Sequence, residues 1–487
     1  MCRIHKAINK VYKNRSTVMM PRLGLVTAAL ALLAAITSGS PAGKVLHAKP
    51  QEGQQGYEEK HSSGRSVSKR SVDLTDAKFH VTDSRLPRDV IPIRYQLELQ
   101  PYPDEGHFKG RVKINITCEE PTDVITLHAH ENLHIAHSEV TVKQLEGKPT
   151  STQQKDPIVK TDYPFNHKGY ESMAMTPMRI LRISSTKKEP SKQWYVITLA
   201  EKLRKGIAYQ LDLSFTGPLS TESTQGFFRV HNQVHRTKEE RWLAATKMSP
   251  SNARRVFPCF DEPDIKTPFK ISVAHSNHML ALSNMPLETA EEMKNETGWT
   301  LDHFKETPPM STFSVAVAVL DLECISNPEN EDGMNVFVFA RPSFLSQIQD
   351  VVNKTMVMLD FLQNYLGVPF SLPKLDLVAL PHYADPEPAD HWGLIILKES
   401  DFTNDDALTW RLADELAQQW FGHLATPVWW GDARINKAIA NYLAALSANQ
   451  DKCNRNLIIS YSLYYEYSKL HPYANLGSQE EYIKIKK

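Results

Sequence analysis

The spacing of hydrophobic residues changes once along this chain of 487 residues, near residue 340. Before that point, short segments alternate apolar and polar residues and are separated by turn residues. A period of two is typical of strands with one buried face. The clearest such segments are residues 95–99, 111–116, 194–199, 209–213 and 336–340. The pattern predicts a mostly antiparallel, β-rich domain with saddle-like or sandwich-like packing over residues 81–322.

From about residue 343 the apolar residues recur three and four positions apart, which is typical of amphipathic helices. Gly367 and Gly422 are stop signals, and Asn404 or Asp405 is a candidate N-cap. The predicted helices cover residues 344–366, 406–421 and 436–450. We therefore expect an α+β chain whose second part, residues 323–487, is mostly helical.

Length and composition set broad limits. The chain is long enough for two or three domains, and 41% hydrophobic and 23% charged residues are typical of globular proteins. Its 56 basic residues equal its 56 acidic residues, so we expect no nucleic-acid partner. The five cysteines are scattered without CxxC spacing, which predicts neither a zinc ribbon nor a dense disulfide framework.

The N-terminal segment is basic and then apolar. The run Leu23–Thr37 is shorter than the roughly 20 residues of a membrane-spanning helix, and small residues follow it. Residues 1–40 are therefore a cleavable signal peptide or a signal anchor that would hold the chain in a membrane. Both readings predict the secretory pathway and an extracellular or plasma-membrane-associated location. Residues 41–80 are polar and predict a disordered stalk or linker.

Beyond residue 80, three tripeptides match the acceptor pattern for N-linked glycans. They predict glycosylation at Asn115, Asn295 and Asn353. The pattern is common by chance, so it has weight here only because the N-terminal segment predicts secretion.

Several motifs occur in a fixed order from about residue 85 to 475. They read RLP at 85–87, ARRVFPCFDEP at 253–263, LSNMP at 282–286, WGLI at 392–395, WFG at 420–422, WWGD at 429–432 and LHP at 470–472. Together they resemble the M1 zinc aminopeptidases, in particular aminopeptidase N-type ectoenzymes. The resemblance implies an N-terminal β domain followed by a thermolysin-like (gluzincin-type) catalytic domain, of which this chain would contain a part.

The chemistry of that family depends on one zinc ion. Catalytic zinc needs three protein ligands and an open position for water, whose pKa the metal lowers. In the HExxH motif two histidines lie on one helix face, and the Glu between them is the general base. The resemblance further implies a third ligand, a Glu on the following helix, and an acidic clamp for the amino group of the substrate.

This chain departs from the family at all three ligand positions, which read Asp414, Gln418 and Lys437. Glu415 alone matches, at the general-base position. A lysine ammonium a few ångströms from a dication adds repulsion of several kcal/mol even at an effective dielectric constant of about 20. We therefore expect no bound metal and no cofactor. We also predict that Lys437 replaces the metal charge by pairing with Asp414 or Glu415.

The clamp positions are altered as well. They read Lys247, Ser249 and Asp390, and only Asp390 is acidic. A relocated metal site that uses His382, His391 or His423 is an alternative that the residues leave open.

These observations favour a catalytically inactive M1 homologue that binds a peptide or protein and reaches the membrane only through an uncleaved N-terminal segment. One alternative is an active zinc metalloaminopeptidase of altered mechanism that releases N-terminal residues. Another is a nonfunctional fragment of a longer ectoenzyme, because the transition-state tyrosine that the resemblance implies would lie beyond Lys487.

Overall fold

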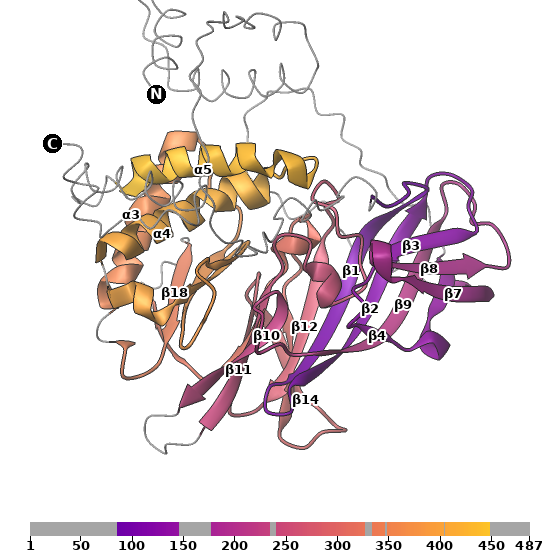
Figure 1. Cartoon of the computed structure of the whole chain (residues 1–487), viewed down its shortest axis with the longest axis horizontal. Coiled ribbons are helices and arrows are strands. Elements are labelled where there is room, and N and C mark those ends of the chain that lie inside the picture. Colours follow the sequence, from indigo (N-terminus) through magenta and orange to yellow (C-terminus); the bar gives the residue numbers. More distant parts are fainter. Residues whose placement is uncertain are drawn as a thin grey trace, which may run out of the picture. The chain divides into compact units, whose positions relative to one another are not determined.

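The computed structural model describes residues 85–145, 177–233, 240–326, 334–345, 348–403 and 405–448 (Figure 1). Residues 81–362 and 370–487 form one compact unit, and residues 1–80 with 363–369 are assigned to another. The predicted signal segment, the predicted stalk and the motif at 470–472 lie outside the described residues. Within the described ranges, no helix is long and apolar enough to cross a membrane.

The largest sheet of the described residues has nine strands and confirms the predicted β-rich domain. Its order is β14-β15-β12-β1-β2-β9-β5-β6, and β4 also pairs with β9. The strands are β1 (Val90–Tyr102), β2 (His107–Cys118), β4 (His134–Ile135), β5 (Thr141–Leu145), β6 (Pro177–Leu181), β9 (Ala208–Pro218), β12 (Phe269–Ser276), β14 (Leu287–Glu292) and β15 (Trp299–Phe304). All pairs are antiparallel except β1 with β12.

The predicted alternation agrees with the burial of these strands. Tyr95, Leu97 and Leu99 of β1 point into the core, where the Tyr95 ring stacks on Phe269 at a centroid distance of 4.5 Å. The thiols of Cys118 and Cys259 are buried and free of disulfides. The apolar face of the sheet therefore forms the main core of this domain.

Two smaller sheets complete the β-rich part. One has the order β3-β8-β7 and contains β3 (Val124–His128), β7 (Ile183–Glu189) and β8 (Trp194–Leu199). The other has the order β10-β11-β16-β13 and contains β10 (Gly226–Gln233), β11 (Glu240–Lys247), β13 (Leu280–Ser283) and β16 (Val317–Leu320). Strand β11 ends at Lys247, so the sheet positions the first residue of the predicted clamp.

The second part contains a five-stranded sheet of order β17-β18-β19-β21-β20. Its strands are β17 (Glu323–Ser326), β18 (Asn335–Ala340), β19 (Lys374–Leu380), β20 (Ala389–His391) and β21 (Leu394–Lys398). Strands β18, β19 and β21 are parallel, and β19 is buried along its whole length, as expected for a strand covered on both faces. Leu320 and Phe339 belong to one hydrophobic cluster, so the core continues across the predicted boundary at residue 322.

Three α-helices are described: α3 (Gln349–Leu366), α4 (Asp405–Gln418) and α5 (Ala433–Ala448). Helix α3 ends before Gly367, whose φ of +68° suits glycine, as predicted. It begins at Gln349 rather than at Phe344, which lies in a turn. Helix α5 begins earlier than predicted, directly after a short 3₁₀ turn at Trp430–Asp432. The α+β class is confirmed.

The predicted end of α4 was wrong. At its start, Asp405 is the first helical residue and therefore not the cap, while the other candidate, Asn404, lies outside the described residues. The α-helix stops at Gln418, and a π-helical segment, Gln419–Leu424, continues it with a kink at Phe421 (φ −105°, ψ 61°). Helices α4 and α5 lie side by side (Figure 1). This arrangement brings the residues predicted at the zinc-ligand positions together.

Candidate functional site

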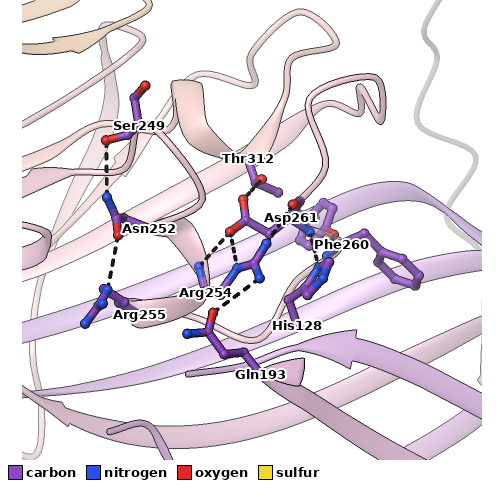
Figure 2. Close-up of polar contacts among 10 residues, drawn as sticks. His128, Gln193, Ser249, Asn252, Arg254, Arg255, Phe260, Asp261 and Thr312 are labelled. Carbon is purple, nitrogen blue, oxygen red and sulfur yellow. Dashed lines mark hydrogen bonds and ion pairs between the residues drawn. The ribbon is translucent and has the colours of Figure 1, made fainter. Parts of the chain in front are cut away.

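The ARRVFPCFDEP segment forms a buried polar network in the β-rich part (Figure 2). Arg254 donates from Nε to Oδ2 of Asp261 at 2.8 Å and from Nη2 to the Asp261 carbonyl at 3.1 Å. Thr312 donates its hydroxyl to Oδ1 of Asp261 at 2.8 Å, and the Asp261 amide donates to Nδ1 of His128 at 3.3 Å. Both carboxylate oxygens of Asp261 are therefore hydrogen-bonded. The motif acts structurally, because it joins its own turn to β3 and to the segment that contains Thr312.

The next acidic residue of the motif fixes the start of the described chain. Glu262 accepts a hydrogen bond from the Leu86 amide at 2.6 Å and an ion-paired one from Arg88 at 2.7 Å. The RLP motif and the FDEP motif, far apart in sequence, are thus one contact. These structural contacts account for both motifs.

The predicted ion pair at the zinc-ligand positions is confirmed. Lys437 of α5 donates from Nζ to Oδ2 of Asp414 on α4 at 2.7 Å. The Asp414 side chain is 9% exposed and that of Lys437 is 31% exposed. Burial lowers the pKa of Lys437, but the carboxylates of Asp414 and Glu415 outweigh it and leave the pKa above its ordinary value. The amine is therefore charged at physiological pH.

Glu415, at the general-base position, also contacts a neighbouring side chain. Gln418 donates from Nε2 to Oε2 of Glu415 at 3.0 Å. Burial raises the pKa of Glu415, as does the nearby Asp390 carboxylate, while Lys437 opposes the rise. Glu415 therefore holds a proton more readily than an ordinary glutamate does.

The residues at these positions do not fit a zinc ion. They supply one carboxylate, one amide that already contacts Glu415, and one ammonium 2.7 Å from that carboxylate. A protonated amine has no lone pair for a metal, and the raised pKa of Lys437 makes its deprotonation harder. In the part of the chain that the structure describes, no group of three or more His, Cys, Asp and Glu side chains could hold a metal.

Two of the three histidines considered for a relocated site are buried instead. His391 is fully buried, which lowers its pKa to about 4, and its Nε2 lies 3.4 Å from the Thr246 hydroxyl. His423 contacts Ser314 through Nδ1 at 2.8 Å. His382 is exposed. The three do not converge on a metal position.

Asp390, the acidic clamp residue, lies on β20 close to two side chains, of which Gln419 hydrogen-bonds to it. Nε2 of His423 lies 3.0 Å from Oδ2 of Asp390, and Gln419 donates from Nε2 to Oδ1 at 3.1 Å. Gln419 also accepts from the Gly393 amide at 2.9 Å, so it links the end of α4 to the β20–β21 turn. The sequence analysis did not predict a role for Gln419. Its position four residues after Glu415, on the same helix face, was the available signal.

The other two clamp positions carry no free negative charge. Lys247 pairs with Asp385 at 2.8 Å and donates to the Glu387 carbonyl at 3.3 Å. Burial raises the pKa of Asp385, but hydrogen bonds from Lys247 and Thr224 outweigh it and lower the pKa. The carbonyl of Ser249 accepts from Asn252 at 3.2 Å. No spacing rule in the sequence could have paired Lys247 with Asp385.

A lysine from the β-rich part anchors the end of the π-helical segment. Lys266 donates to the carbonyls of His423 at 3.1 Å and Leu424 at 2.7 Å. Burial lowers its pKa to about 8. These contacts fix the backbone that carries His423 beside Asp390.

Comparison with known proteins agrees with this architecture. The peptidase M1 N-terminal domain matches residues 91–314, and the peptidase family M1 domain matches residues 351–485. Endoplasmic reticulum aminopeptidase 1 of Homo sapiens is 31% identical over 376 residues, which is 75% of this chain and 36% of that protein.

Two further relatives give similar values. The thyrotropin-releasing hormone-degrading ectoenzyme of Rattus norvegicus is 32% identical over 373 residues, 74% of this chain and 31% of that protein. Aminopeptidase N of Mus musculus is 29% identical over 392 residues, 77% of this chain and 37% of that protein. The chain thus spans about a third of the length of these relatives. Two consecutive domain matches in the order of the observed β-rich and helical parts show that this chain belongs to the peptidase M1 family.

Proposed function

We propose that this chain is a catalytically inactive M1 homologue that binds a peptide or protein at the cell surface or outside the cell. The ion pair between Lys437 and Asp414 supports the loss of catalysis. Zinc-dependent hydrolysis needs a metal with an open coordination position, and here an ammonium lies against the only carboxylate among the three ligand positions. Glu415 has no metal-bound water to deprotonate.

The altered clamp supports a binding mode that does not depend on a free amino terminus. A substrate ammonium would need an unpaired carboxylate, yet Asp390 accepts a hydrogen bond from Gln419 and lies 3.0 Å from Nε2 of His423. Asp385 is neutralised by Lys247. We therefore expect peptides with free and with blocked amino termini to bind equally well.

A hollow of about 400 Å³ on the nine-stranded sheet is the proposed binding place. Strands β1, β2, β4 and β9 contribute to it. Its polar lining includes Glu98, Gln100, Lys109, Arg111, His134 and Thr216. These side chains supply donors, acceptors and both signs of charge, which suits a peptide backbone with polar side chains.

The proposed location rests on the N-terminal segment and on the relatives. One relative is named an ectoenzyme and another an endoplasmic reticulum aminopeptidase. Both names are compatible with entry into the secretory pathway. The polar residues 41–80 would then act as a stalk.

The retained carboxylates of Glu415 and Asp390 favour one competing function, an active aminopeptidase of altered mechanism. Hydrolysis of aminoacyl arylamides by the purified chain, with added zinc and with a chelator, separates the two. We expect no chelator-sensitive turnover and no stoichiometric zinc by elemental analysis. Turnover that the chelator abolishes would overturn the proposal.

Binding is tested with a fluorescent mixed-sequence peptide pool, in free and acetylated forms. Equal anisotropy changes for the two forms support the proposed mode, and a loss of binding in the Glu98→Gln, Lys109→Ala variant would place the ligand in the hollow. Matched substitutions outside the hollow, at Lys188 and Glu201, serve as controls. Rapid proteolysis of the secreted chain and absence of binding would favour the alternative of a nonfunctional fragment.

A further inference from the structure

The three predicted glycan acceptors lie in different surroundings. Asn115 is on β2, Asn353 is on α3, and Asn295 lies in the turn between β14 and β15. A glycan is bulky and needs an acceptor on a surface loop. We propose that, of these three acceptors, Asn295 carries the N-linked glycan and Asn115 and Asn353 stay unmodified. The inference rests on the secretory location within the proposed function.

The turn at Asn295 presents the acceptor outward on a fixed base. Asn295 and Thr297 are exposed, whereas Glu296 between them points back to the sheet. Glu296 accepts from Gln100 Nε2 at 2.6 Å and from the Tyr102 hydroxyl at 2.7 Å. The two residues that the modification uses therefore face solvent, because the residue between them is tied down.

The surroundings leave room for a branched sugar. All six residues of β14 are exposed, and within the described ranges this strand pairs on one side only, with β15. Gly298, which closes the turn with φ +83°, has no atom within 4 Å of the place that a Cβ would take. The exposed strand and the open space at Gly298 are therefore compatible with a glycan at this turn.

The other two acceptors lack these properties. Asn115 lies on β2, which pairs with β1 and β9, and its half-buried side chain accepts a hydrogen bond from Gln210 at 3.0 Å. Thr117 of the same tripeptide is buried. Asn353 is exposed, but its partner Thr355 is fully buried and donates its hydroxyl to the Val351 carbonyl at 2.7 Å.

The reaction needs a lipid-linked oligosaccharide diphosphate as the second reactant. The Asn295 amide nitrogen forms a bond to the anomeric carbon of the first sugar and loses one proton. The bond from that carbon to the phosphate oxygen breaks, and the lipid diphosphate leaves with the electron pair. No oxidation or reduction occurs.

The test is expression of the full chain in animal cells, with and without a secretory signal placed before Met1. The purified chains are treated with peptide-N-glycosidase in heavy-oxygen water, and the acceptor peptides are weighed by mass spectrometry. We expect labelled aspartate at position 295 only. Asn295→Gln should abolish the glycosidase-sensitive gel shift, and Asn115→Gln and Asn353→Gln should leave it unchanged.

The two forms of the chain separate the site from the location. If position 295 is labelled in the chain with the added signal but not in the chain without it, the site is supported and the predicted secretory location is overturned. An unlabelled position 295 in a chain recovered from the medium, or label at 115 or 353, overturns the site.

Discussion

Two cation–carboxylate pairs in this molecule can be compared directly. In the β-rich part, Arg254 and Asp261 are both buried, and both Asp261 oxygens accept hydrogen bonds. At the positions of the family's zinc ligands, Lys437 is partly exposed and only one Asp414 oxygen is paired. The other oxygen is buried and has no hydrogen-bond partner among the described residues. The first pair belongs to a motif that matches the family, whereas the second belongs to one that departs from it.

The two pairs differ in how completely their polar atoms are satisfied. Arg254 and Asp261 form part of a complete network, in which the geometry of several elements is fixed together. Lys437 balances charge but satisfies only part of the hydrogen bonding of Asp414. The residues at the family's zinc-ligand positions therefore form a simple ion pair.

The largest expected effect is the return of a metal. The triple variant D414H/Q418H/K437E restores three ligands on neighbouring helices, so its zinc content after dialysis should rise to about one ion per chain. Elemental analysis measures it. The double variant D414H/Q418H is the control and should stay metal-free, because the Lys437 ammonium remains. Equal zinc in both variants would show that Lys437 is not the obstacle.

The next effect concerns the complete network. Arg254→Met leaves the Asp261 charge buried without its cation, which should lower the free energy of unfolding by about 3–5 kcal/mol. Urea unfolding followed by fluorescence checks this. Arg255→Met is the matched control: that arginine is only half-buried and its guanidinium donates to Asn252 at 3.1 Å. An equal loss of stability in Arg255→Met would show that the buried pair of Arg254 with Asp261 is no more important than an ordinary arginine contact.

Acid should weaken the region around the former clamp. Because burial lowers the pKa of His391 to about 4, the unfolded chain binds more protons than the folded one between roughly pH 6.5 and 4. The contribution of His391 to stability is present above pH 6.5 and is lost as the pH falls, by up to about 3 kcal/mol.

Urea unfolding of the wild type and of H391N across this range measures the effect of acid. The difference in unfolding free energy between the two should change steeply between pH 6.5 and 4. A constant difference would show that His391 is not held neutral by burial.

The smallest effect on stability should come from loss of the ion pair between Lys437 and Asp414. Lys437→Met should cost about 1–2 kcal/mol, less than Arg254→Met, because Lys437 is partly exposed and solvent screens its charge. The double variant D414N/K437M should recover part of that loss, since no buried charge remains. A double-mutant cycle in thermal unfolding measures the coupling. A cycle that closes to zero would mean that the pair contributes nothing to stability.

The strands with alternating patterns were predictable because each has one buried face. The alternation at residues 95–99 corresponds to the buried Tyr95, Leu97 and Leu99 of β1. The end of α3 was predictable from Gly367, since the signal is local. The end of α4 was not, because contacts from distant residues, Lys266 and the β20–β21 turn, hold the π-helical segment.

In the candidate site, too, some contacts could be predicted from the sequence and others could not. The pairing of Lys437 with Asp414 could be predicted because the motifs place both at positions that share one metal in the family. The contacts of Asp390 with His423 and of Lys247 with Asp385 could not, because they depend on how the strands and helices pack. Periodicity gives no information about such distant partners.

The ion pair of Lys437 with Asp414 between α5 and α4 has a consequence for how the yield of folded protein depends on zinc supply. Where a metal closes a fold, the yield of folded protein follows the supply of that metal and falls when a chelator removes it. Here the cation that pairs with Asp414 is a side chain of the same polypeptide, so it is present at a fixed ratio to its carboxylate. Cells starved of zinc and cells rich in zinc should therefore contain the same amount of the folded protein.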